Sequence, residues 1–177
     1  MAVSPRIRRA RILQAAEGYL ELDLPRRALA ELERIEEPAS RKARWYTLAA
    51  EAWQQLDDTE RALAAWSRVL MEDPLDLDVL LGLAWCYRRT GQVSREISAL
   101  QDACRAWPEE GRALFRLACA LAVAGEQEQA LSWLGRAVRL DRELRNRIHD
   151  EPDLASLRTV PGFEVIAGVE QTGDTSE

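Results

Sequence analysis

The residue types that build catalytic and metal centres are scarce in this chain. Its 177 residues include one histidine, His149, and three cysteines, Cys86, Cys104 and Cys119, with no CxxC pair. This pattern indicates neither a disulfide framework nor a thiolate metal site. A Ser-His-Asp or Cys-His mechanism would have to pass through His149, which is far from the cysteines in sequence and is typical of a helix end. We therefore expect no enzyme activity, no cofactor and no metal.

Long apolar runs and an excess of positive charge are also missing. The longest uncharged runs, such as residues 117–124, are far shorter than the roughly 20 residues of a membrane-spanning helix. With 24 basic and 30 acidic residues the net charge is -6, which disfavours a protein that coats nucleic acid phosphates. The first ten residues carry arginines but no apolar stretch, so they do not form a signal sequence and favour the cytoplasm.

A repeat of 34 residues is what the sequence does contain. Stepping through the chain by 34 aligns seven columns in four copies without an insertion, with Glu96 as the one misfit. The small-residue column is Ala16, Ala50, Ala84 and Ala118, and the turn column is Asp23, Asp57, Gly91 and Gly125. Within each copy the apolar spacing predicts one helix before the turn and a second helix after it.

These columns resemble the tetratricopeptide repeat family. Its 34-residue hairpin has a small residue at position 8, an aromatic at 11, Gly at 15 and Ala at 20. The matching copies begin near Arg9, Ala43, Leu77 and Gly111. The resemblance implies an all-α fold, a right-handed superhelical solenoid of helix-turn-helix hairpins.

The resemblance also gives an expected domain layout. A basic lead (1–8) precedes the four repeats, which span residues 9–42, 43–76, 77–110 and 111–144. Residues 145–167 are similar to the closing segment of bacterial members of the family and are expected to be capping helices that cover the last apolar face. Residues 168–177 are polar and acidic, and we expect them to be a disordered tail.

Positions of the first helices that the core does not use are the candidate binding residues. The resemblance implies that they line the concave groove in which partner peptides bind. They are Arg44, Thr47, Glu51, Gln54, Leu81, Trp85, Arg88, Arg89, Arg112, Phe115, Arg116 and Cys119. Aromatics beside arginines are typical of interaction hot spots and predict a peptide with apolar and acidic residues. In the alternative interpretation Trp85 and Phe115 pack between adjacent first helices.

The sequence thus predicts a non-enzymatic scaffold or adaptor for an unidentified protein partner, with no small-molecule substrate and no membrane insertion. Leu13 and Glu17 replace the Lys and Asn by which co-chaperone members of the family clamp a C-terminal carboxylate. Three alternatives stay open: a small acidic chaperone of a secretion system, a homo-oligomerisation module, and, less favoured, an RNA- or DNA-binding protein. The last would use the arginine-rich start, which contains Arg6, Arg8, Arg9 and Arg11.

Overall fold

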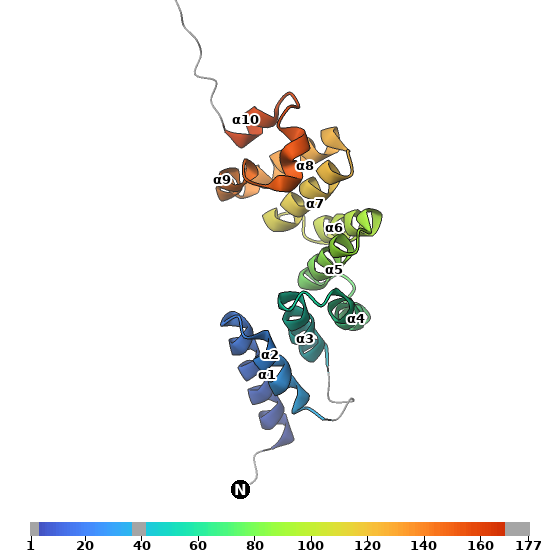
Figure 1. Cartoon of the computed structure of the whole chain (residues 1–177), viewed down its shortest axis with the longest axis vertical. Coiled ribbons are helices and arrows are strands. Elements are labelled where there is room, and N and C mark those ends of the chain that lie inside the picture. The colour runs from blue at the N-terminus through green and yellow to red at the C-terminus, as the bar shows by residue number, and fades with distance from the viewer. Residues whose placement is uncertain (1–3, 37–41, 169–177) are drawn as a thin grey trace, which may run out of the picture. The chain divides into compact units, whose positions relative to one another are not determined.

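All regular secondary structure in the described part of the chain is helical, as the repeat predicts. The computed structural model describes residues 4–36 and 42–168 (Figure 1). The chain divides into two compact units, Met1–Gln92 and Val93–Glu177, and the boundary falls inside the expected third copy. Within the described ranges, no helix is both long enough and apolar enough to cross a bilayer. The expected disordered tail lies outside the described residues from residue 169 onward.

The first unit contains two helix pairs and the first helix of the third copy. Its elements are α1 (Pro5–Glu21), α2 (Pro25–Glu33), α3 (Ala43–Gln55), α4 (Thr59–Leu70) and α5 (Leu77–Arg89). Helix α1 begins earlier than the expected repeat start at Arg9, because Ser4 caps it by accepting a hydrogen bond from the Ile7 N–H and Pro5 fits the first helical position. Residues 5–8 of the expected basic lead are therefore the first turn of a helix.

Each hairpin turn is closed by the same backbone arrangement. The turn residues Asp23, Asp57, Gly91 and Gly125 all adopt a left-handed conformation, with φ between 54° and 84°. In every copy the residue after the turn position donates a backbone hydrogen bond to the carbonyl five positions earlier, for example Gln92 N to Tyr87 O at 2.8 Å. This is the Schellman cap, which glycine adopts without strain and aspartate tolerates. It confirms the turn column predicted from the sequence.

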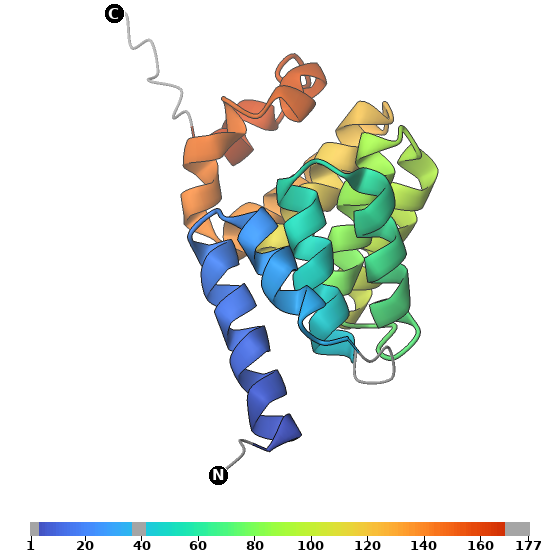
Figure 2. The ribbon, with the colours of Figure 1, turned by 60° about the horizontal axis from the view of Figure 1, so that its bottom comes forward.

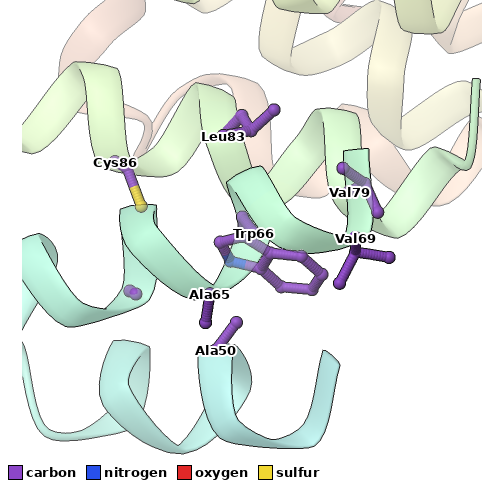
Figure 3. Close-up of a cluster of buried hydrophobic side chains, with 8 residues drawn as sticks. Ala50, Ala65, Trp66, Val69, Val79, Leu83 and Cys86 are labelled. Carbon is purple, nitrogen blue, oxygen red and sulfur yellow. The ribbon is translucent and has the colours of Figure 1, made fainter. Parts of the chain in front are cut away.

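The indole of Trp66 is the centre of one apolar cluster in the first unit. Its side chain is 2% exposed and lies among Ala65, Val69, Val79 and Leu83 (Figure 3). The ring also presses against the backbone of α5 at Gly82, where a Cβ would overlap the indole. The indole N–H donates a hydrogen bond to Gln54 Oε1 at 3.0 Å, which fixes the orientation of the ring. Helices α4 and α5 therefore approach closely only because residue 82 has no side chain.

The second unit contains the remaining repeat helices and the closing segment. Its elements are α6 (Val93–Ala106), α7 (Gly111–Val123), α8 (Gln127–Leu140), η2 (Arg142–Leu144), α9 (Arg145–Ile148), η3 (Pro152–Leu157) and α10 (Phe163–Ala167). Helices α7 and α8 form a pair, and η3 packs chiefly against α7. The closing segment contributes Leu154, Leu157 and Phe163, which are fully buried. The last repeat thus has no open apolar face on that side.

The misfit of the repeat, Glu96, is buried in α6 with 5% of its surface exposed. The other copies place Ala28, Ala62 and Ala130 at this position, each with no exposed surface. Removing a carboxylate from water has a free-energy cost that an alanine does not have. The third copy therefore keeps the repeat register while placing a carboxylate where the other copies have a methyl group.

We predict that Gly82→Ala lowers the free energy of unfolding by about 1–3 kcal/mol, the range for an overpacked core. The buried, hydrogen-bonded indole of Trp66 cannot move away from the new methyl group. Urea denaturation of Gly82→Ala, Trp66→Leu and the double variant measures the coupling. Because Leu is smaller than Trp, the Ala substitution should cost less in the Trp66→Leu background, and equal costs in the two backgrounds would contradict the contact.

Candidate functional site

In the first unit, α1, α3 and α5 are the first helices of their copies, and α3 contacts both of the others (Figure 2). Seven of the eight predicted binding residues of this unit have exposed or half-buried side chains. Gln54 is one of them but hydrogen-bonds to a core side chain; the other six are Arg44, Thr47, Glu51, Trp85, Arg88 and Arg89. We call these six residues the first-helix face. The structure thus brings together, on two neighbouring helices, half of the residues predicted from the sequence.

Charged groups of α1, α3 and α5 meet at one side of this face. The guanidinium of Arg44 forms an ion pair with Glu17 of α1, and this hydrogen bond raises the pKa of Arg44. Burial raises the pKa of Glu51 above its ordinary value, and the nearby carboxylates of Asp78 and Glu17 add to the effect, whereas Arg44 opposes it. Carboxylates therefore outnumber the guanidinium in this part of the face.

Trp85 on α5 dominates the other side. It is half-buried and packs against the Trp66 cluster, so part of its ring remains accessible. The guanidinium of Arg89 lies 5.8 Å from the centre of the Trp85 ring and forms an ion pair with Asp57 in the turn of the preceding hairpin. A cation near an aromatic face is favourable. This pairing holds Arg89 beside the exposed part of the ring.

Two predicted residues of the first unit are used internally. The side-chain oxygen of Gln54 accepts the hydrogen bond from the Trp66 indole, and Leu81 is only 7% exposed. Leu81 is therefore closed to a partner, and the Gln54 side-chain oxygen is already engaged. The sequence pattern places both on the first helix but does not reveal the tilt of that helix against its neighbours.

In the second unit, the closing segment covers two predicted binding residues of α7. Phe115 and Cys119 are 5% and 6% exposed. The Arg147 guanidinium lies 5.6 Å from the Phe115 ring centre, and the Ser156 hydroxyl donates a hydrogen bond to Ala122 O at 3.3 Å. Phe115 is therefore a packing residue, as the alternative interpretation predicts. It packs against the closing segment, whereas that interpretation expected an adjacent first helix. Arg112 remains exposed and pairs with Glu110 at 3.1 Å, and Arg116 is half-buried.

The packing of the closing segment on α7 also brings together a trio of possible metal ligands that the sequence did not reveal. The sulfur of Cys119 and carboxylate oxygens of Glu151 and Asp153 lie within 4.8 Å of one another. The cysteine is more than thirty positions from either carboxylate, so no local spacing reveals the trio. Acidic groups commonly approach one another without an ion, and proximity alone does not make the trio a metal site. His149 ends α9 and packs edge-on against Phe163, with the ring centres 5.9 Å apart.

A cleft of about 450 Å³ in the first unit was also not predicted. It is lined by Arg26, Leu29, Ala30, Glu33, Trp53, Leu56, Asp58 and Arg61. The Arg61 guanidinium lies 4.6 Å from the centre of the Trp53 ring. The sequence pattern assigns Trp53 to the core, but its side chain is half-buried and lines this cleft. The lining of the cleft combines two arginines with two carboxylates, so the cleft favours neither an anionic nor a cationic ligand.

Comparison with known proteins identifies the fold. A family model described as tetratricopeptide repeat matches residues 46–111 and 97–144. The structure is similar to MamA AMB-1, with a TM-score of 0.70 at 15% sequence identity over 96% of both chains. It is also similar to TTC0263, a thermophilic TPR protein of Thermus thermophilus, with a TM-score of 0.67 at 22% identity over 89% of this chain and 85% of that one. No functionally curated protein sequence shows significant similarity to the chain.

The three thiols should be unreactive in the folded protein. All three cysteines are free and buried, and burial raises the pKa of Cys86 and Cys104 from 9.0 to about 11. At pH 8 this shift lowers the thiolate fraction about 100-fold, and the thiolate is the reacting form. We expect Ellman's reagent to titrate three thiols within seconds in guanidinium chloride and none in that time under native conditions. Fast native reaction of Cys86 or Cys104 would show that the core opens readily.

Replacing Glu51 by Gln should stabilise the protein at pH 7. The folded state binds a proton at Glu51 at higher pH than the unfolded chain, so ionisation of this carboxyl costs folding free energy. The gain should disappear as the pH falls towards the ordinary value of 4.5, where the carboxyl is protonated in both states. Urea denaturation between pH 4.5 and 7 tests this, with Glu72→Gln at an exposed loop position as the control. A loss of stability at pH 7 would mean that Glu51 is stabilised by its cationic neighbour.

Proposed function

The chain belongs to the tetratricopeptide repeat family, whose domains generally serve protein interaction, and from that premise we propose that it is a non-enzymatic scaffold that binds a partner peptide through the first-helix face. The single observation that carries this proposal is the half-buried Trp85 ring with the Arg89 guanidinium beside it, on a helix that also carries Arg88. Large aromatic and arginine side chains dominate the binding energy of protein interfaces.

The chemistry of the face specifies the proposed ligand. An apolar side chain of the partner would cover the exposed part of Trp85, and an adjacent Asp or Glu would pair with Arg88 or Arg89. The carboxylates of Glu17, Glu51 and Asp78 on the other side of the face would repel a second acidic residue. We therefore propose a segment whose apolar and acidic residues are contiguous rather than a uniformly acidic one.

Rigidity supports this role. The face is built on helices, and the ion pairs from Arg44 to Glu17 and from Arg89 to Asp57 connect those helices to their neighbours. A surface that is ordered before binding loses little conformational entropy when an extended segment binds. Arg112 and Arg116 on α7 remain proposed binding residues of the second unit, whereas Phe115 and Cys119 are covered there. Because all three cysteines are free, we propose a reducing compartment, the bacterial cytoplasm.

Selection of peptides from a random displayed library tests the proposal. The wild type should enrich peptides with an apolar residue next to Asp or Glu. The variant Trp85→Ala, Arg88→Glu should lose this enrichment, because both the apolar contact and the cation are removed. Phe115 is left unchanged in this variant because its truncation would disturb the packing of the closing segment.

The matched control is Arg68→Glu, which makes the same charge change at an exposed position on the second helix α4. It should keep the wild-type enrichment, and circular dichroism should confirm that all three proteins are folded. An identical peptide consensus on the wild type and the Trp85→Ala, Arg88→Glu variant would place binding elsewhere on the molecule. The absence of any consensus on the wild type would contradict the proposed ligand.

A further inference from the structure

The N-terminal half of α1 carries an isolated concentration of positive charge. The first sixteen residues contain four arginines and no acidic residue, although the whole chain has 30 acidic against 24 basic residues. Arg6, Arg8, Arg9 and Arg11 lie on the ordered helix Pro5–Glu21, and none of them forms an ion pair with another described residue. An acidic protein therefore keeps four guanidinium groups together and unneutralised within the described fold.

This part of α1 is not used to hold the fold together. The first buried side chain of the helix is Ile12, followed by Ala16 and Leu20. Figure 2 shows the N-terminal half of α1 extending beyond the ends of α2 and α3 in the same unit. Arg6, Arg8 and Arg11 are exposed and Arg9 is half-buried, and Ile7 between them is 50% exposed. The arginines therefore contribute little to the packing of the fold.

The distribution of the arginines around the helix indicates the shape of the partner. At about 100° per residue, the four side chains leave the axis at roughly 0°, 140°, 200° and 300°. A flat anionic membrane or protein surface would contact one side of the helix and leave the other arginines in water. A membrane-bound helix would also need a continuous apolar face, and this ring of arginines interrupts it. A partner with negative charge on both sides of the helix uses all four arginines.

Duplex DNA has this arrangement. Its major groove is about 12 Å wide, admits one α-helix, and is bordered by phosphates on both sides. The major groove of duplex RNA is too deep and narrow for such an insertion. We propose that the N-terminal half of α1 binds the phosphate backbone of duplex DNA by entering the major groove, with Arg6, Arg8, Arg9 and Arg11 as the contacting residues. This activity does not depend on the first-helix face.

Salt dependence provides the test, because each phosphate contact contributes about -0.9 to the slope of log affinity against log salt. Fluorescence anisotropy with a labelled 20-base-pair DNA duplex measures the affinity of the full chain from 50 to 200 mM NaCl. Four contacts predict a weakening on the order of 10²-fold over this range. The variant Arg8→Ala, Arg9→Ala should show only about a tenfold weakening, because two contacts remain.

The matched control is Arg26→Ala, Arg27→Ala, which removes two exposed arginines of α2 in the same unit and should keep the wild-type salt dependence. Three results would overturn the proposal. The first is that the wild type fails to bind the duplex at 50 mM NaCl. The second is that the control loses as much salt dependence as the Arg8→Ala, Arg9→Ala variant. The third is that duplex RNA, polyglutamate or anionic vesicles compete as well as unlabelled DNA. The third result would assign the arginines to another polyanion.

Discussion

The left-handed turn that closes each hairpin is the constraint on which the rest of the structure depends. One residue per copy adopts a positive φ, and two backbone hydrogen bonds fix the direction in which the second helix leaves the first. Because the same cap recurs at Asp23, Asp57, Gly91 and Gly125, every copy presents the same face of its first helix. Trp85 on α5 is half-buried, whereas the closing segment covers Cys119 at the same repeat position, so accessibility also depends on what packs beside the helix.

Packing between copies then depends on complementary sizes rather than on a uniform core. Trp66 fills the space that the other copies give to Leu32, Leu100 and Leu134, and Gly82 opposite it has no side chain. A large residue in one copy is thus matched by the smallest residue in the next. Such a pair makes the packing between the second and third copies specific. The copies are therefore not interchangeable, although their turns adopt the same backbone conformation.

The sequence predicts those features that the local period determines. The helices, the turn residues and the all-α fold follow from spacings of three, four and 34 residues, and the structure confirms them. The candidate site was predicted less well, because burial there depends on distant residues. Phe115 and Cys119 are covered by residues 147–156, a segment of short helices outside the repeat, and the Gln54 side chain accepts a hydrogen bond from an indole twelve residues away. The cleft beside Trp53 is lined by residues of two successive hairpins, and the apolar spacing within one copy does not predict such a cleft.

The closing segment also fixes the length of the array. Leu154, Leu157 and Phe163 occupy the apolar surface of α7 and α8 against which another hairpin would otherwise stack. Growth by duplication of a hairpin after residue 144 would therefore have to carry this segment along to the new end. An insertion inside the array would leave the closing segment on its own repeat, provided that it does not separate Trp66 from Gly82. Variation in repeat number among descendants of this chain is therefore expected to arise inside the array.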